Sequence, residues 1–508
     1  MEINQDAKTL CAPAAALDTV AEQLADVDLT LPDYCPDIEK ILKCTLTPKL
    51  QSKSLSGGQL QIDGYCVVTV LYVESEKKTI RCCEQSVSFS QSFTLRETPD
   101  NPVIITSTKP EYINCRALSP RRLVMHGAFS LYAKVMTSSC SPVYSPNDPQ
   151  LEANIVKVPR ANLKSFCQEQ FSVYEEISTA DKPQVESLLY TDVEAYLTDT
   201  KAVTGKLMVN GELSLKLFYL SDVQTGETAK LDYVLPFNQI IDCEGIDEET
   251  VNCVSVELMS YDLRLKNDML SDSPSIAVDA RLCVTEEGYL VGEEDIVTDV
   301  YSVSNVSSPR FEQLNIAEAV TPVSESFIEK LTVRVDDKIS RILDIYSDSV
   351  TADFTPTSDG MKLSGKINLC LLALGEKGAP VFIERAFDCE HILASAPDCN
   401  SLIYPNIRAA SISYRLADDN TVEIRCELKL NAGAVKKESV RAVSDIEIFE
   451  DKPITGDNYA LTLYFASKGE KLWDIAKSHN TRLERLISEN SADKMTLEEP
   501  QMLLIPGI

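Results

Sequence analysis

The sequence predicts a mainly β protein: three tandem β-rich domains followed by a small domain of the order β-α-α-β. Three observations predict this fold class. Runs in which apolar and polar residues alternate, the pattern of half-buried strands, occur along most of the chain. One such run, opened by a glycine, occurs three times at similar intervals. Within the segment 460–508 the alternation is interrupted by two stretches with helical spacing.

Length and charge limit the possible functions. The chain has 508 residues, and at about 150 residues per domain it should hold three or four domains. Apolar residues (44 %) and charged residues (25 %) are present in the proportions of a folded protein. The net charge of −30 disfavours a nucleic-acid groove and attraction to an anionic membrane surface.

The first segment, 1–30, has no basic region and carries acidic residues within its apolar stretch, so it is not expected to be a secretory signal. No run of about 18 uncharged apolar residues predicts a transmembrane helix. A long chain without a signal is expected in a reducing cytosol, where its 16 cysteines would be free thiols rather than disulfides.

The first recognisable element is the stretch LPDYCPDIEKILKC, residues 31–44. Ile38, Ile41 and Leu42 have the i, i+3, i+4 spacing of one helical face, and Asp37 stands where a helix would be capped. The stretch therefore predicts a short helical turn at the start of a domain.

The same turn pattern returns at 183–189 and 338–343. Gly64, Gly211 and Gly365 each lie 26 residues beyond the first apolar residue of their turn, and each opens an alternating run. Such a glycine is expected where a side chain would crowd the neighbouring backbone. The interval is too long for a solenoid repeat, so it predicts three homologous domains in tandem.

The predicted division has six parts. They are an N-terminal segment (1–30), unit 1 (31–150), unit 2 (151–320), unit 3 (321–442), an acidic linker (443–459) and a small C-terminal domain (460–508).

The CPDIEKIL turn, the spaced glycine strand and the tandem arrangement resemble the SPOCS domain of endospore-forming bacteria, which occurs in spore coat morphogenetic proteins. The resemblance is clearest in unit 1. In the second copy Gln184 replaces the Asp of PDIE, and in the third Ser340 replaces its Glu. The acidic residues are therefore not a triplicated catalytic pair, whereas the apolar spacing persists as a structural element would.

The C-terminal domain is predicted as a strand over 461–465, a helix around 472–476, a second helix and a strand over 502–505. Thr481 and Glu484 have the spacing of a capping box at the start of the second helix.

This order resembles a LysM module, with Gly469–Trp473, Ile475-Ala476, Asn490 and Leu503–Pro506 at the positions of its usual pattern. LysM modules commonly bind N-acetylglucosamine-containing glycans in a groove between the first turn and the segment before the last strand. The resemblance implies a partner- or glycan-binding groove formed by Gly469, Glu470, Lys471, Leu472, Trp473, Asn490, Glu499, Pro500 and Gln501.

Two departures from the LysM pattern favour protein over glycan. Lys471 places a long cation where a small hydroxyl residue is usual, and Glu499-Pro500 replaces the common Pro-Gly. For Trp473, the only tryptophan, core packing is favoured over stacking on sugar.

No catalytic constellation is found. His126, His391 and His479 have no partner at metal-ligand spacing. The cysteines include Cys82-Cys83 but no C-x-x-C pair, and Cys66 among others falls inside a strand pattern. A zinc site built by cysteines of different strands is left open but not predicted. No cofactor is expected.

The sequence therefore predicts a non-enzymatic scaffold in spore coat assembly. The resemblance implies a protein partner, the coat-basement ATPase SpoIVA or one like it, contacted through the LysM domain. It also implies a place in the mother-cell cytoplasm at the forespore surface. The alternative is a peptidoglycan-binding protein anchored at spore cortex or cell wall by glycan binding. A wall hydrolase is disfavoured, because the three large units are copies of one another.

Overall fold

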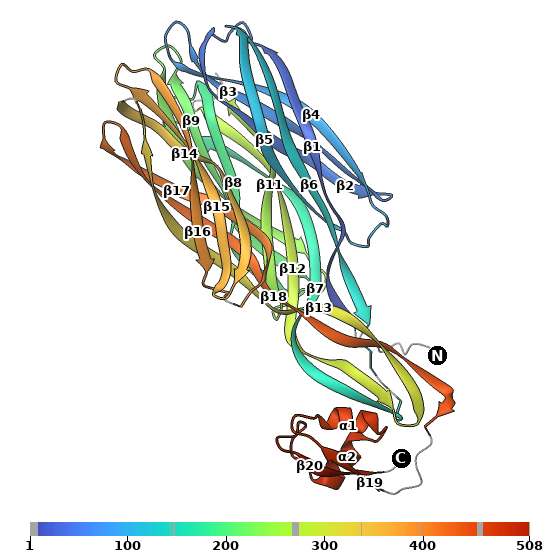
Figure 1. Cartoon of the computed structure of the whole chain (residues 1–508). Coiled ribbons are helices and arrows are strands. Elements are labelled where there is room, and N and C mark those ends of the chain that lie inside the picture. Colours follow the sequence, from blue (N-terminus) through green and yellow to red (C-terminus); the bar gives the residue numbers. More distant parts are fainter. Residues whose placement is uncertain are drawn as a thin grey trace.

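The computed structural model describes residues 9–142, 144–145, 148–266, 274–336, 338–396, 398–454 and 461–506. Within them the chain is almost entirely strand, with two short helices near the C-terminal end (Figure 1). This confirms the mainly β prediction and the small helical domain at the end. No helix in this part of the chain is long and apolar enough to cross a membrane.

The elements are β1 (Thr9–Thr30), β2 (Ile38–Ser56), β3 (Gln59–Glu74), β4 (Ile80–Thr94), β5 (Val103–Ser119), β6 (Arg122–Pro142), β7 (Leu151–Ser178), β8 (Ser187–Val203), β9 (Lys206–Asp222), β10 (Glu227–Asp242), β11 (Val251–Lys266), β12 (Ser275–Ser302), β13 (Asn305–Arg334), β14 (Ile339–Thr357), β15 (Gly360–Gly375), β16 (Pro380–Leu393), β17 (Ser401–Asp418), β18 (Thr421–Pro453), β19 (Leu461–Ala466), α1 (Leu472–Ser478), α2 (Leu483–Asn490) and β20 (Gln501–Pro506).

The first eighteen strands form three two-sheet sandwiches of six consecutive strands each. In sandwich 1 the sheet β1-β6-β5 faces the sheet β2-β3-β4 across one apolar core. Sandwich 2 pairs β7-β12-β11 with β8-β9-β10, and sandwich 3 pairs β13-β18-β17 with β14-β15-β16. In each sandwich the sixth strand returns to pair with the first. Inward-facing residues of the two sheets fill the space between the sheets.

Three of the predicted segment limits differ from the strands. β1 pairs with β6 along its length, so residues 9–30 belong to the first sandwich rather than to a separate segment. β13 crosses the expected limit at residue 321. β18 pairs with β13 as far as Pro453, so much of the expected linker 443–459 is strand; residues 455–460 lie outside the described residues. The division into domains at the other limits stays a prediction.

The predicted helical turn at 37–42 is wrong, because strand β2 begins at Ile38. Ile38, Lys40, Ile41 and Lys43 pair with successive residues of β3, and the register shifts twice. Each shift is a β-bulge, an extra residue in one strand. Two bulges so close together reproduce the i, i+3 spacing of a helix.

One bulge also occurs near the start of β8, and two occur near the start of β14. In the three strands the bulges leave Leu42, Leu189 and Leu343 without a direct partner. These leucines turn away from their own sandwiches into one apolar cluster that all three sandwiches share. Equivalent residues of the middle strands, Leu71, Phe218 and Leu372, complete it. The apolar residues that recur in the three turn patterns therefore help to join the sandwiches to one another.

The three spaced glycines lie where the prediction requires them. A β-carbon on Gly64, Gly211 or Gly365 would overlap a backbone carbonyl oxygen of the neighbouring strand. In the first two sandwiches a phenylalanine ring, Phe89 or Phe237, also covers the glycine.

The C-terminal domain has the predicted β-α-α-β order, with β19 antiparallel to β20. The predicted capping box is wrong. Helix α2 is preceded by Arg482 and has no side-chain cap, while the buried Thr481 hydroxyl donates to the carbonyl of Pro506 at 3.2 Å. Thr481 thus holds the end of β20 instead of the helix.

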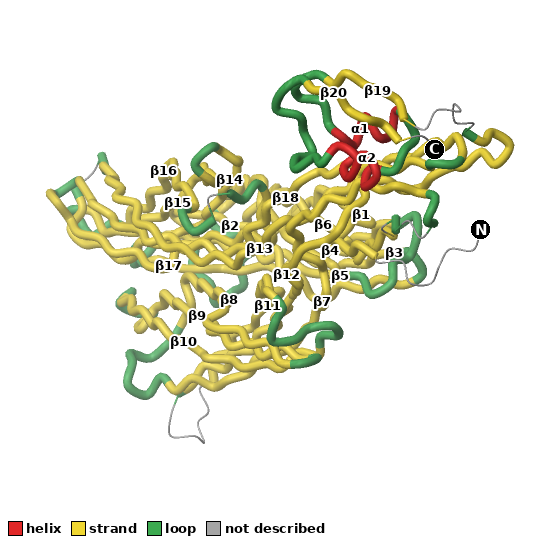
Figure 2. The backbone as a smooth tube through the Cα atoms, turned by 90° about the horizontal axis from the view of Figure 1, so that it is seen from below, coloured by secondary structure: helices red, strands yellow, loops and turns green. Residues whose placement is uncertain are grey.

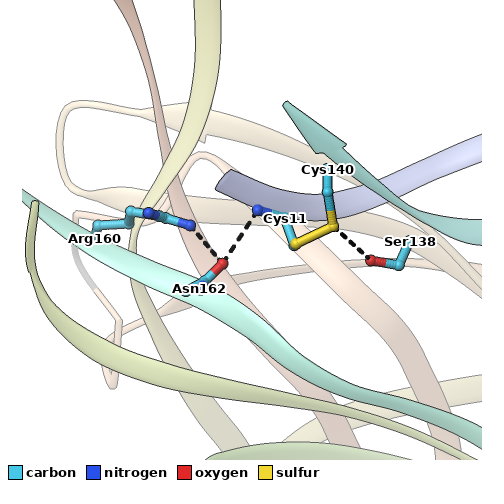
Figure 3. Close-up of a disulfide and its surroundings, with 5 residues drawn as sticks. All are labelled: Cys11, Ser138, Cys140, Arg160 and Asn162. Carbon is cyan, nitrogen blue, oxygen red and sulfur yellow. Dashed lines mark hydrogen bonds between the residues drawn. A yellow bond between two sulfur atoms is a disulfide. The ribbon is translucent and has the colours of Figure 1, made fainter. Parts of the chain in front are cut away.

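Two cysteine pairs depart from the expectation of free thiols. Cys11 lies opposite Cys140 in the β1–β6 ladder, and the two form a disulfide (Figure 3). The Cys11 N–H donates to the side-chain oxygen of Asn162 on β7 at 3.2 Å, and Arg160 donates to the same oxygen. The pair therefore adjoins sandwich 2. The second disulfide joins Cys167 and Cys243.

The C-terminal domain lies beyond one end of the sandwiches, next to the long strands β7, β12, β13 and β18 (Figure 1). Both views place α1 and α2 between the β19–β20 pair and these strands (Figure 2). One face of the strand pair therefore points away from the body.

Candidate binding surfaces of the C-terminal domain

A groove lies between the turn before α1 and the segment before β20. Gly469 N–H donates to Leu497 O at 2.8 Å, Leu497 N–H to Glu470 O at 3.0 Å, and Leu472 N–H to Met495 O at 2.9 Å. Gly469 has a φ of 91°, which favours glycine, and a β-carbon there would meet no other atom within 4 Å. The groove is lined by Lys468, Gly469, Lys494, Met495, Thr496, Leu497, Glu498 and Glu499.

Only some of the predicted groove residues reach it. Gly469 and Glu499 are part of its lining, while Lys471, Pro500 and Gln501 are exposed outside that lining.

Three others have internal roles. Leu472 is fully buried in the core of the domain. The Glu470 carboxylate accepts a hydrogen bond from the Tyr464 hydroxyl at 3.1 Å, which raises the pKa of that tyrosine. The Asn490 amide donates to Leu504 O and accepts from Leu504 N–H, both at 2.7 Å, and so fixes α2 to β20.

Trp473 is packed, as predicted, but its partners belong to sandwich 2. Only 7 % of the residue is exposed. Its indole N–H donates to Asp299 Oδ2 on β12 at 2.8 Å, and its ring meets Tyr301 edge-on at 5.1 Å between centroids. The tryptophan is therefore not available as a stacking platform for sugar.

Further contacts fix α1 and the start of α2 to β12 and to Pro149, which precedes β7. Lys477 Nζ lies 2.6 and 2.8 Å from the two carboxylate oxygens of Asp299. The Tyr301 hydroxyl donates to Thr481 O at 2.7 Å, and burial raises the pKa of this tyrosine well above its ordinary value. Arg482 donates to Pro149 O at 2.9 Å. The helical side of the C-terminal domain is thus occupied by the body of the protein.

The opposite side carries an apolar surface that the sequence analysis missed. Alternation along β19 turns Tyr464 and Ala466 inward and their neighbours outward. The outward residues, here called the strand face, are exposed as follows: Leu461 48 %, Leu463 66 %, Phe465 71 % and Met502 63 %. The sequence did contain a signal for this surface. The segment 461–466 has apolar residues at positions that face both sides of a strand, which is unusual for a strand with one side in water.

One group of possible metal ligands is already neutralised. Asp348, Cys370 and Glu384 have ligand atoms within 4.8 Å of one another. The ammonium group of Lys43 lies among them, 2.9 Å from Asp348 and 3.1 Å from Glu384. Lys43 of sandwich 1 thus forms ion pairs with Asp348 and Glu384 of sandwich 3 and connects the two sandwiches.

The histidines are far from one another and have separate packing partners. His126 contacts Asp26, His391 contacts Glu325 and stacks on Phe327, and His479 meets Tyr464 edge-on; these are the contacts found among the described residues.

A family model described as SipL, SPOCS domain, matches residues 37–118 and 184–266. No curated protein and no solved structure matches the chain. The two segments begin at corresponding bulged strands, β2 and β8, and extend to β5 and β11. They lie in the first two sandwiches at equivalent places, with their spaced glycines and both bulged openings included. Two segments of the chain, in sandwiches 1 and 2, are therefore SPOCS domains of the SipL type.

Proposed function

We propose that this protein is a non-enzymatic adaptor in endospore coat assembly, which docks onto a coat-basement ATPase of the SpoIVA type through its LysM-like C-terminal domain. Its SPOCS domains of the SipL type support a role in sporulation and the spore coat. The proposed place of action is the mother-cell cytoplasm at the forespore surface.

The strand face is the observation that carries the docking proposal. Leu463, Phe465 and Met502 present flexible and aromatic apolar side chains to water on one face of a two-stranded sheet. Burying such side chains at the centre of an interface is the main source of affinity between proteins. A sugar chain offers hydroxyl groups and would leave most of this face exposed.

The body supports the same proposal. Because Trp473, Lys477 and Thr481 hold the helices against β12, the strand face is directed outwards. Three sandwiches joined through one cluster give a broad support on which further contacts can add to the affinity of the first.

The alternative, glycan binding at cortex or wall, uses the other surface. The groove beside Gly469 is open, and its rim carries Lys468, Lys494, Glu498 and Glu499. Lys494 and Glu498 form an ion pair at 2.6 Å across one edge.

The test compares the two surfaces in the full-length chain. A purified SpoIVA-type ATPase is titrated onto the immobilised wild-type protein, the strand-face variant Phe465→Ser and the groove variant Met495→Ser. Phe465 and Met495 are both strongly exposed (71 % and 59 %), so neither change empties a core. We expect Phe465→Ser to weaken binding at least about tenfold, the loss of one well-buried anchor residue, and Met495→Ser to leave it within about twofold.

Soluble N-acetylglucosamine oligomers and purified sacculi are offered to the same proteins. If the ATPase does not bind, or if the oligomers displace it and only Met495→Ser loses affinity, the docking proposal is wrong and the groove is the binding surface.

A further inference from the structure

Three potential metal ligands meet inside sandwich 2, away from the surfaces described above. Cys167 on β7, Cys243 just beyond β10 and Glu286 on β12 bring one ligand atom each to within 4.8 Å of one another. Cys167 lies directly opposite Glu286 in the β7–β12 ladder. Cys243 reaches them from the end of the other sheet, where its N–H donates to Gly205 O at 3.0 Å. Both sheets of the sandwich therefore contribute to the group.

Glu286 occupies a position that its strand otherwise reserves for apolar residues. Alternation along β12 places it in the inward row of Leu282 and Val284, which belong to the core. The residue is 0 % exposed. Its carboxylate accepts hydrogen bonds from Ser165 Oγ at 2.7 Å and contacts Cys167 Sγ at 3.6 Å, and no cation pairs with it among the described residues. A buried carboxylate is costly unless it is protonated or paired with a cation, and a bound metal ion would supply that cation.

A second acceptor beside it has no donor. Asn252 Oδ1 is buried and has no hydrogen-bond partner among the described residues. This oxygen, Ser165 Oγ and Glu286 Oε1 all face the space over the α-carbon of Gly288, where a β-carbon would overlap all three. The absence of a side chain at Gly288 therefore leaves room for the oxygens to converge.

Sandwich 1 shows that the fold does not require these residues. In sandwich 1 the strand equivalent to β12 is β6, and the strand equivalent to β7 is β1. Counted from the first pair of each ladder, Ala133 on β6 is equivalent to Glu286, and its partner Thr19 on β1 is equivalent to Cys167. Leu95 follows β4 and donates its N–H to Gly58 O, as Cys243 does to Gly205 O. The equivalent positions thus hold threonine, leucine and alanine, which cannot bind a metal as a set.

We propose that, in the reduced protein, Cys167, Cys243 and Glu286 bind a zinc ion. Two thiolates and a carboxylate suit Zn²⁺, which is usually four-coordinate, and Asn252 Oδ1 or a water completes the set. The two sulfur atoms, joined in this structure, separate to ligate the metal at about 2.3 Å each. The ion offsets the charge of the two thiolates, gives the buried carboxylate a direct cationic partner, and ties the two sheets of sandwich 2 together.

The test measures zinc in the full-length protein. The chain is reduced with a phosphine, loaded with ZnCl₂ and desalted, and its zinc content is measured by elemental analysis. The variants are Glu286→Gln, which preserves shape, and Cys243→Ala; the control is Cys283→Ala, a change at another buried cysteine outside the group. We expect about one zinc per chain in the wild type and control, and at least tenfold weaker retention against a chromogenic chelator in both variants.

Cobalt supplies a readout independent of stability. Co²⁺ bound by the reduced wild type is expected to show near-ultraviolet thiolate-to-metal absorption, reduced in Cys243→Ala but not in Cys283→Ala. Circular dichroism establishes that each variant is folded. The inference is overturned if the reduced wild type retains no zinc, or if folded Glu286→Gln and Cys243→Ala retain as much as the control.

Discussion

At the scale of single residues, the backbone of the neighbouring strand determines what a position tolerates. The three spaced glycines were predicted from the sequence because their interval recurs, and each proves to face a carbonyl oxygen of the adjacent strand. Glu286 could not be predicted in the same way. An isolated Glu-Glu pair in a strand reads as solvent-facing, and only the register with Cys167 reveals that it is buried.

Gly211→Ala is expected to destabilise the protein by about 1–3 kcal/mol. The new methyl group overlaps Tyr196 O and the Phe237 ring, so the strand or the ring must shift. The measurement is the midpoint of unfolding in denaturant, followed by far-ultraviolet circular dichroism. Gly292→Ala on β12 is the matched control, because a β-carbon there meets nothing within 4 Å, and it should change the midpoint little. Equal effects of the two changes would contradict the steric explanation.

At the scale of elements, strand existence was predictable and strand irregularity was not. Period-two alternation identified strands β3, β9 and β15. At Ile38, Ile41 and Leu42 the two bulges shift the phase of that alternation, and the resulting spacing matches a helix. Pairing with β3 decides the outcome, and pairing is a long-range property that a local window does not contain.

Leu189→Ala is expected to cost about 2–5 kcal/mol, as removal of a buried leucine side chain usually does. Because Leu189 contributes to the cluster shared by all three sandwiches, we also expect differential scanning calorimetry to resolve more than one transition in this variant. Val203→Ala, at an exposed position on the same strand, is the control and should leave the transition unchanged. A uniform shift with no change in shape would show that the cluster does not couple the sandwiches.

At the scale of the whole molecule, the sequence predicted the C-terminal domain but not where it sits. Its β-α-α-β order follows from local spacing, whereas the fit of Trp473 onto Asp299 and Tyr301 depends on two surfaces brought together by the fold. The strand face escaped prediction for a related reason, since exposure of Phe465 depends on which side the helices cover.

Asp299→Ala is expected to loosen the C-terminal domain from the body, because it removes the acceptor of Trp473 and the partner of Lys477. Trp473 is the only tryptophan, so its fluorescence should shift to longer wavelength as it meets water, and amide exchange in residues 461–506 should accelerate. Asp295→Ala, an exposed change on the same strand, is the control. Unchanged emission in Asp299→Ala would mean that the remaining contacts, those of Tyr301 and Arg482, are enough to hold the domain.

The length of β18 has a mechanical consequence. This strand of 33 residues runs through sandwich 3 and ends on the side where the C-terminal domain lies (Figure 1). Once the contacts of the domain with β12 are broken, a pull on the domain is carried by β18 and loads its ladders to β13 and β17 in shear. In shear many hydrogen bonds share the force at once, whereas in peeling they break one at a time. The body is thus built to resist tension applied through its C-terminal end.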